Sequence, residues 1–435
     1  INVRYVTDGG TEFELDYDLD DSENRYPNWL TQAQFNANPA QNSTGRVYTI
    51  SDRKSDTLTY KVKRKLTDNL TLLRNSSILN KETEIKSYNS SAITTYGTPS
   101  KYQYDYYNTD YILNYENGNL KIDSGYTSLD GSRTFPVATA YVPANTTSKK
   151  NIGFFSQLQY NQGDSTYSIG ARKETVKYEY KPASGIQKNA KHHLEAFDVG
   201  FNTRLNPSTT VFTNFNQAFQ APLIDRFFTY NGGFNGFMSP STSKTINLGL
   251  NYLTDKSKTK VTLYRSNIRN EMFYNSATYA NTNLDESHKQ GLELQNTFAV
   301  NPKLSTNVNY AYTNAIIDKE ADNSEFNGKT NPMTSKHNIS ASVIYSISDK
   351  AKMTLTQKYR SSAFAEEDYT NTATQKQKAY NSTDFNFSYS PNEDLEFNFD
   401  VENLFENSYG TWLRADVIYP GNSTRNIKAG LSYKF

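Results

Sequence analysis

The sequence contains no cysteine, and that absence removes several kinds of chemistry at once. A chain without thiols has no disulfide framework, no thiolate metal site and no cysteine nucleophile. It also lacks any run of about 18 apolar residues, so no membrane-spanning helix is predicted. The formal net charge is only +1, which gives no overall field that would favour nucleic acid or a strongly charged partner.

Catalytic and metal-binding motifs are missing as well. None of the histidines, His192, His193, His288 and His337, stands in an HExxH or Cys/His metal spacing. We expect the adjacent pair His192 and His193 to be solvated at a loop edge rather than to bind a metal. No GxSxG, GxxxxGK[ST] or GxGxxG motif marks a nucleophile or a nucleotide site. The sequence therefore predicts no catalytic residue, no metal site and no cofactor.

The chain is rich in aromatic residues that alternate with polar ones. Tyr and Phe number 34 and 24, although hydrophobic residues make up only 36% of the chain. In "DLEFNFDVEN", Leu395, Phe397, Phe399 and Val401 share one face, and "INLGLNY" and "LSTNVNYAY" repeat the pattern. This period of two predicts β-strands with one apolar and one polar face.

The links between these strands alternate between two kinds. Short ones carry turn residues, as in Asp8-Gly9-Gly10, Asn117-Gly118 and Asn301-Pro302-Lys303. Long ones, rich in Tyr, Asn, Ser and Thr, are expected over residues 20–53, 83–102, 131–148, 180–191, 219–242, 272–286, 317–332, 362–377 and 408–422. About nine links of each kind predict about 19 strands of roughly 10 to 15 residues.

Short turns at one end and long loops at the other are typical of an outer-membrane barrel. The predicted fold is therefore all-β, a transmembrane antiparallel β-barrel whose apolar face meets lipid and whose polar face meets the lumen. A soluble all-β repeat protein is the alternative. If the short turns are periplasmic, the last strand, in "NIKAGLSYKF", ends at the periplasm, and so does the first. We then expect an odd number of strands to precede residue 1, and three would complete a barrel of about 22.

Two stretches resemble signature motifs of TonB-dependent outer-membrane receptors. "FNQAFQAPLIDRFF" is similar to the family pattern F+AP.L.ELY, with Gln220 and the pair Arg226-Phe227 as departures. "FDVENLFENSYG" is similar to V.NLFD..Y, with Glu406 as a departure. Weaker similarities to further family strands follow in the family's order. The matching residues are Phe219, Ala221, Pro222 and Leu223 in the first motif, and Asn403, Leu404, Phe405 and Tyr409 in the second.

The resemblance implies a 22-stranded barrel with an N-terminal plug that imports scarce nutrients with energy from TonB. Residues 1–435 are then expected to form a truncated barrel domain in the bacterial outer membrane, without the plug, the TonB box and about three strands. The implied partners are the TonB complex, acting through that plug, and outer-membrane lipid. The barrel-assembly machinery would read the terminal strand through Leu431, Tyr433 and Phe435.

The first long loop, "RYPNWLTQAQFNANPAQN", resembles the ferric dicitrate branch of the family. It implies import of a ferric siderophore or ferric citrate, with iron present only as part of the transported chelate. An anionic chelate favours Arg for paired carboxylate contacts and Tyr or Trp as amphipathic walls. The candidate ligand-binding residues in or near loops are Arg25, Trp29, Arg133, Tyr230, Arg360, Trp412 and Arg414.

Other functions are compatible with the same pattern. One is TonB-dependent import of cobalamin, haem or a saccharide. Another is a passive outer-membrane pore, or a barrel enzyme with a Ser–His pair in its wall that no sequence motif identifies. Ligand screening would separate the first group, and conductance or hydrolysis without a plug would reveal the second.

Overall fold

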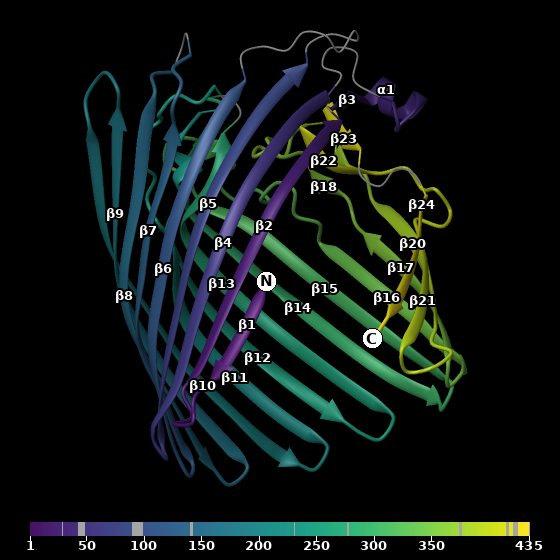
Figure 1. Ribbon diagram of the computed structural model, residues 1–435. Helices are drawn as coiled ribbons and strands as arrows, with labels where there is room; N and C mark the ends of the chain where they lie inside the picture. The colour runs from purple at the N-terminus through teal and green to yellow at the C-terminus, as the bar shows by residue number, and fades with distance from the viewer. Residues whose placement is uncertain are drawn as a thin grey trace.

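The computed structural model describes residues 1–27, 29–41, 48–88, 99–139, 142–229, 231–275, 278–373, 376–414, 417–420 and 425–434. Nineteen strands form one sheet, and each pairs antiparallel with its neighbours (Figure 1). Its strands in the first half of the chain are β1 (Asn2–Val6), β2 (Glu12–Pro27), β4 (Tyr48–Thr67), β5 (Leu70–Tyr88), β6 (Ser100–Asn117), β7 (Leu120–Phe135), β8 (Asn145–Gln162), β9 (Ser165–Pro182) and β10 (Lys188–Asn206). Those in the second half are β11 (Thr209–Gln220), β12 (Ser241–Leu253), β13 (Ser257–Asn275), β14 (Ala280–Asn301), β15 (Leu304–Lys319), β16 (His337–Ser348), β17 (Ala351–Arg360), β20 (Tyr380–Tyr389), β21 (Leu395–Glu402) and β24 (Asn426–Tyr433).

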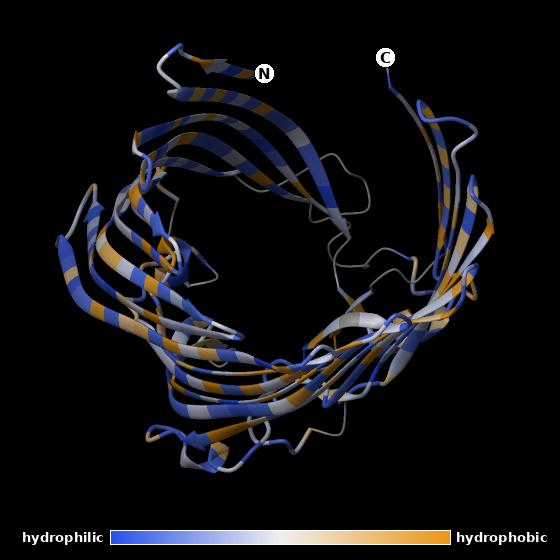
Figure 2. Cartoon of the chain, turned by 90° about the horizontal axis from the view of Figure 1, so that it is seen from below, coloured by the Kyte–Doolittle hydropathy of each residue, from blue (hydrophilic) through white to orange (hydrophobic). Residues whose placement is uncertain are grey.

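The sheet follows the chain as a meander that curls around a central space. Each strand pairs with the next strand of the sheet in chain order, from β1 and β2 to β21 and β24. Seen along its axis, the sheet forms an open ring with the two chain ends on either side of the opening (Figure 2). Among the described residues, no pairing joins β1 to β24. The predicted barrel and its 19 strands are confirmed, and the strands expected before residue 1 stay a prediction.

The short turns lie together at one end of the sheet, and the longer loops lie at the other (Figure 1). Gly10, Gly118 and Gly163 in the short turns have φ of 73°, 55° and 56°. This left-handed region suits glycine, because a side chain would clash there, and tight hairpin turns require it.

The predicted extents of strands and loops were wrong at the long-loop end. β4 has 20 residues and β14 has 22, against the expected 10 to 15. Most of the long link expected over residues 272–286 belongs to β13 and β14. Apolar alternation marks only the strand residues beside lipid. Beyond them, Asn, Ser, Thr and Tyr are suited to water on both faces, so backbone pairing continues without an apolar signal.

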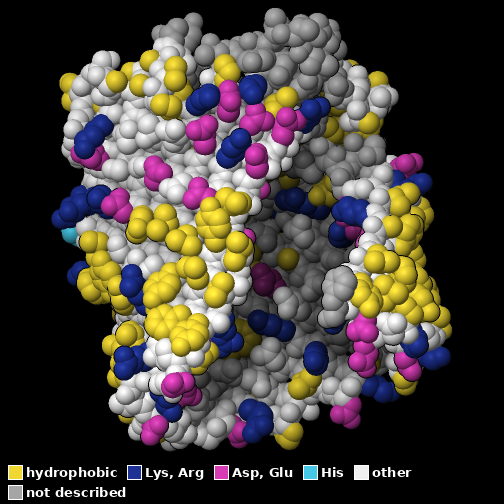
Figure 3. All heavy atoms as spheres, in the orientation of Figure 1, with side chains coloured by type: hydrophobic (Ala, Val, Ile, Leu, Met, Phe, Trp, Pro, Cys, Tyr) yellow, Lys and Arg dark blue, Asp and Glu magenta, His cyan; other side chains and the backbone are white. Residues whose placement is uncertain are grey.

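The two faces of the sheet differ as predicted. On β12, Ile246, Leu248, Leu250 and Tyr252 are exposed apolar side chains on one face. On the other face polar side chains bond across strands, as where Asn247 Nδ2 donates to Asn214 Oδ1 at 2.8 Å. Figure 3 shows apolar side chains gathered around the middle of the outer wall, with charged side chains above and below them. The outer wall is therefore apolar at the height where lipid chains would lie.

Several short helices and strands lie at the long-loop end of the sheet. Among the described residues, no helix is long and apolar enough to cross a membrane. The small elements are β3 (Leu30–Thr31), α1 (Gln32–Ala37), η1 (Ile224–Phe227), η2 (Ser324–Phe326), β18 (Ala363–Phe364), β19 (Lys376–Gln377), β22 (Gly410–Arg414) and β23 (Val417–Pro420). β3, β22 and β23 form a small sheet that joins the first long loop to the last.

Candidate functional site

The predicted ligand residue Arg133 lies in β7 and is almost entirely buried. Its Nε lies 2.9 Å from Asp225 Oδ1 in η1, and its side chain is 5% exposed. The guanidinium also lies over two rings, 4.6 Å from the centroid of Tyr102 and 4.0 Å from that of Phe228. Tyr104 donates to the same Asp225 oxygen at 3.0 Å. Arg133 therefore holds the segment after β11 against the wall of the barrel.

The first family motif forms the start of this held segment. Pro222 is fully buried, and its carbonyl accepts hydrogen bonds from Lys149 Nζ at 3.0 Å and from the Tyr178 hydroxyl at 2.8 Å. Phe219 and Ala221 pack against buried hydrophobic residues, whereas Leu223 is 65% exposed. We call these buried residues the aromatic cluster: Val176, Tyr178, Tyr180, Leu194, Ile224, Phe227, Phe228 and Met238.

The second family motif forms a turn after β21. Asn403 has φ of 52° and is almost fully buried. Its side chain bonds Asn407 in both directions, donating to the carbonyl and accepting from the amide, each at 3.0 Å. Its amide donates to Asp384 Oδ1 at 2.9 Å, and the next amide, of Leu404, donates to the Thr383 carbonyl at 2.7 Å. The motif thus fixes the loop, while Phe405 stays 66% exposed.

Trp412 and Arg414 lie together in β22, above the lumen. The Arg414 Nε lies 3.0 Å from Glu367 Oε2, and its guanidinium lies 5.4 Å from the ring of Tyr274 and 5.7 Å from that of Tyr279. The Trp412 ring meets Tyr419 edge-on at 4.7 Å. Arg414 therefore links three loops at the mouth of the barrel.

The loops at the mouth are packed into one group, which we call the loop cluster. Leu413, Ile418 and Ala365 form a small core onto which Phe35 of α1 packs. Glu366 extends this group, because its amide donates to the Leu413 carbonyl at 2.9 Å. Burial raises the pKa of the Glu366 carboxyl, while Trp412 and Arg414 act in the opposite direction. The cluster thus holds a carboxyl group that is partly shielded from water.

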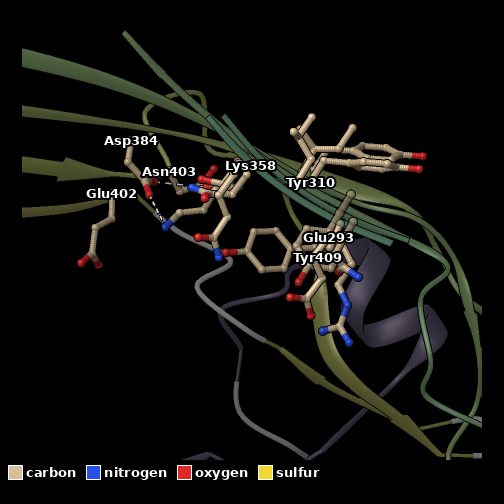
Figure 4. Close-up of a pocket in the computed structure, with 18 residues that line it drawn as sticks. Glu293, Tyr310, Lys358, Asp384, Glu402, Asn403 and Tyr409 are labelled. Atoms are coloured by element: carbon tan, nitrogen blue, oxygen red, sulfur yellow. Dashed lines mark hydrogen bonds and ion pairs between the residues drawn. The ribbon is translucent and has the colours of Figure 1, made fainter. Parts of the chain in front are cut away.

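A large cavity lies below this cluster, on the lumenal face of β14 to β21. It has a volume of about 600 Å³, and Figure 4 shows its lining side chains. Arg360 and Lys358 line it and lie on the opposite strand face from the outward Tyr359 and Leu355. The Arg360 Nε donates to Ser335 Oγ at 3.0 Å. We call this the inner cavity.

Charged groups of both signs line the inner cavity. Lys358 Nζ lies 2.6 Å from Asp384 Oδ2, an interaction drawn in Figure 4. Glu402 pairs with Lys428 at 2.7 Å, and Glu293 also lines the cavity. The lining therefore offers cationic donors beside carboxylates, of which Asp384 and Glu402 have cationic partners.

Two tyrosines separate the inner cavity from a second cavity in the loops. Tyr380 and Tyr409 stack with their ring centroids 4.3 Å apart and their planes 2° apart. Both line the inner cavity, and both also line an outer cavity of about 310 Å³ with Lys376, Lys378 and Phe35. Burial raises the pKa of the Tyr409 phenol. The stacked pair, which we call the tyrosine pair, is thus a common wall of the two cavities.

The remaining predicted residues lie apart from these cavities or beyond the description. Arg25 lies in β2, where its Nε is 2.8 Å from Glu23 Oε1, and Trp29 is exposed beside the first long loop. Leu431 and Tyr433 are exposed on β24. Tyr230 and Phe435 lie outside the described residues. The structure thus brings Arg360 and Tyr409 to one cavity and joins Trp412 and Arg414 in one cluster, but leaves Arg133 elsewhere.

Sequence reasoning missed Tyr380, Lys358 and Asp384. They lie on two consecutive strands of the sheet, β17 and β20, which a long link separates in the sequence. The register that pairs Lys358 with Ser382 and Arg360 with Tyr380 makes them neighbours. One signal was available, because the period of two puts Tyr380 on the same face as Asp384, opposite the apolar Phe385 and Phe387 of "DFNFSY". In the ranges that the structure describes, no group of three or more His, Cys, Asp or Glu side chains is placed to hold a metal ion.

Comparison with known proteins places this architecture in a family. The family profile described as TonB dependent receptor-like, beta-barrel, matches residues 3–404. No match to a curated protein was found. Among solved structures, the ferric-catecholate import receptor Fiu of E. coli K12 in its closed form is similar, with a TM-score of 0.79 and 15% identity over 98% of this chain and 72% of that one.

Two further structures are similar over the whole of this chain. The unliganded ferric citrate transporter FecA has a TM-score of 0.78 and 18% identity, over 100% of this chain and 69% of that one. The copper transporter OprC has a TM-score of 0.80 and 14% identity, over 100% of this chain and 71% of that one. At such identities the likeness concerns the fold, whereas the profile match spans most of the sequence. This chain therefore belongs to the TonB-dependent receptor-like β-barrel family.

Proposed function

We propose that this chain forms the outer-membrane barrel of a TonB-coupled importer of a ferric chelate, a ferric siderophore or ferric citrate. Two of the similar structures are described as a ferric-catecholate import receptor and a ferric citrate transporter, which supports iron as the cargo. A copper transporter has the same fold, so the choice of ligand rests on the chemistry of the site.

The observation that carries this proposal is the inner cavity beneath the tyrosine pair. Its volume of about 600 Å³ falls within the roughly 300 to 1,000 Å³ typical of small-molecule sites. Tyr380 and Tyr409 offer flat aromatic surfaces, and Arg360 and Lys358 offer cationic donors on the same wall. Aromatic walls and cationic donors together match an anionic chelate with planar carboxylate or catecholate arms.

The loop cluster supplies the first contacts in this proposal. Arg414 is held between Glu367 and the rings of Tyr274 and Tyr279. Its guanidinium has further donors, so a chelate carboxylate entering from outside competes with Glu367 for a group already in position. Trp412 and the lysines of the outer cavity extend the same entry surface. The chelate then passes the tyrosine pair to reach the inner cavity.

The partners follow from the same proposal. Energy comes from the TonB complex through a plug domain inside the barrel. Outer-membrane lipid surrounds the apolar outer wall, and the barrel-assembly machinery recognises the last strand through Leu431 and Tyr433. No nucleic acid takes part, and the chain acts as a transporter without catalytic residues.

The test uses the product of the whole gene, purified from outer membranes. Titration calorimetry compares ferric citrate and a ferric catecholate with cobalamin, haem and an oligosaccharide. We expect a ferric chelate to bind with Kd below about 1 μM, more tightly than its iron-free form. Uptake of radioactive iron by iron-starved cells should depend on both this gene and TonB. Binding of only a non-iron ligand, or a steady conductance of the intact protein in planar bilayers, would contradict the proposal.

A further inference from the structure

Three lysines stand side by side on the outer wall of the barrel. Lys150 of β8 pairs in register with Lys177 of β9, and Lys177 pairs with Lys191 of β10. Lys177 shares its strand face with the exposed Ile169, and Lys191 shares its face with the exposed Phe197. Since successive side chains of a strand point to opposite faces, all three ammonium groups lie outside the barrel.

The arrangement is unfavourable unless a negative charge compensates it. Like charges directly opposite each other on neighbouring strands repel, because their Cβ atoms are only about 5 Å apart. Lys150 has a carboxylate partner, Asp130, at 2.7 Å. Within the described residues, neither Lys177 nor Lys191 forms an ion pair with a carboxylate.

A second acidic group near these lysines, Glu179, is already engaged. Glu179 lies two residues from Lys177 on the same face, but it pairs with Lys181 at 2.9 Å and accepts a hydrogen bond from Gln187 Nε2 at 2.6 Å. The three lysines therefore carry an excess of positive charge, because the Glu179 carboxylate is engaged by Lys181 and Gln187.

The lysines also surround a hollow in the outer wall. A cavity of about 460 Å³ is lined by Ser148, Lys150, Lys177, Glu179, Asn189 and Lys191, among others. Hydroxyl and amide groups beside ammonium groups form a donor-rich surface that suits the oxygens of a phosphate.

The apolar band of the wall begins next to this hollow. On β8, Ile152 and Phe154 follow Lys150 on the same face and are 48% and 61% exposed. On β10, Phe197 and Val199 lie on the face of Lys191 and are also exposed. A ligand whose phosphate fills the hollow would thus have its apolar part directly against these side chains.

We propose that the Lys150–Lys177–Lys191 row binds the phosphate of a phosphorylated lipid headgroup in the outer leaflet around the barrel. The ammonium groups neutralise the phosphate, and the acyl chains lie on the apolar band beside it. Free phosphate would meet the same donors but would gain nothing from the adjacent apolar wall. This inference rests on the proposed outer-membrane location and not on the identity of the imported chelate.

The experiment measures lipid binding to the purified whole-gene product by native mass spectrometry in detergent. The probe is a diphosphorylated, acylated glucosamine disaccharide, and its dephosphorylated form is the comparison ligand. We expect the double variant K177Q/K191Q to bind the phosphorylated probe about tenfold more weakly for each lysine removed. The variant K177R/K191R, which keeps both charges, should retain binding.

Lys173 provides the matched control on the same strand and face. It is exposed but pairs with Glu195 at 3.1 Å, so K173Q removes the same charge without removing a lysine of the row. We expect K173Q to bind the probe as the unchanged protein does. A gel shift between heated and unheated samples verifies that each barrel is folded.

Three results would overturn the inference. One is equal binding of the probe by K177Q/K191Q and the unchanged protein, and another is equal binding of the dephosphorylated lipid. The third is displacement of the lipid by millimolar inorganic phosphate, which would make the row a general anion site. Membrane fractionation tests the location separately, and chelate titration of K177Q/K191Q shows whether import chemistry is untouched.

Discussion

Two regions at the mouth of the barrel carry the family motifs, but they are packed in opposite ways. Residues 224–229 and 231–240 follow the first motif, and the rings of Phe228 and Phe234 pack against Tyr180 of the wall. Phe227 is fully buried, meeting Tyr178 at 4.8 Å and Phe237 at 5.0 Å, both edge-on. The second motif instead borders the inner cavity of about 600 Å³ through Asn403 and Tyr409.

This difference separates structural residues from residues available to a ligand. Next to the aromatic cluster, the Arg133 guanidinium lies against Asp225, and the Pro222 carbonyl accepts a hydrogen bond from Lys149. At the second motif, Tyr409 of the motif and its neighbour Tyr380 line both the inner and the outer cavity. We therefore expect substitutions in the first region to change stability and those in the second to change ligand affinity.

The largest effect is expected from Phe227→Ala. Removing a fully buried ring from a packed aromatic core costs about 3 to 5 kcal/mol. Hydrogen exchange of the amides in residues 224–229 should therefore accelerate strongly. Leu223→Ala, at a side chain that is 65% exposed, is the control and should change the opening free energy by less than about 0.5 kcal/mol. Unchanged exchange in Phe227→Ala would mean that the region is not held by its rings.

Tyr409→Ala tests whether the second region determines ligand affinity. Loss of one face of the tyrosine pair should weaken binding of the ferric chelate by about 10- to 100-fold, the loss typical of a buried aromatic contact. Tyr409→Phe keeps the ring and should bind within about threefold of the unchanged protein. Titration calorimetry gives both values.

The substitution Arg133→Lys in the first region tests the same contrast between stability and ligand affinity. Arg133→Lys removes the planar group that lies over Tyr102 and Phe228 but keeps the charge near Asp225. It should destabilise residues 221–240 by about 1 to 2 kcal/mol while leaving chelate affinity unchanged. A large loss of affinity in Arg133→Lys would make Arg133 a ligand contact and erase the distinction between the two regions.

The sequence predicted the strands and turns of the barrel wall well, but it predicted the side-chain contacts at the mouth of the barrel poorly. Alternation such as Ile246, Leu248 and Leu250 reports directly on lipid exposure, and turn residues such as Gly118 report on local backbone geometry. Neither signal depends on distant residues. The partners of an arginine side chain do depend on distant residues. Strand register and loop folding bring Arg133 to Asp225 of η1 and Arg360 to Ser335.

Asn403 offers a smaller and more local test of the second region. Its backbone is left-handed, with φ of 52°, and its side chain makes two bonds to Asn407. Asn403→Gly loses the hydrogen bonds to Asn407, but glycine adopts the left-handed backbone conformation without strain. Asn403→Ala loses the same bonds and is also strained in that conformation. Asn403→Ala should therefore be about 1 kcal/mol less stable than Asn403→Gly in urea unfolding. Equal stability of the two variants would show that the turn changes its backbone when the side chain is lost.

The smallest expected effect comes from the Glu366 carboxyl in the loop cluster. Burial raises its folded pKa above the ordinary 4.5, so its contribution to folding is complete below that value and is lost as the pH rises through the raised pKa. Once the pH exceeds the raised pKa, the folded cluster holds a partly buried charge. Glu366→Gln removes that charge and should stabilise the cluster at pH 7 by about 0.5 kcal/mol, since water still screens the group.

At pH 4, below the ordinary 4.5, the same substitution should change the stability less, because most of the carboxyl is then protonated in both states. Limited proteolysis of residues 361–373 at the two pH values measures the difference. Glu367→Gln is the contrasting variant, since Glu367 pairs with Arg414 at 3.0 Å and its loss should instead loosen the cluster at pH 7. If Glu366→Gln also loosens the cluster at pH 7, the attraction of Arg414 and Trp412 for the charged carboxylate outweighs its burial. The loop cluster would then resemble the aromatic cluster, held by its own contacts rather than open to a ligand.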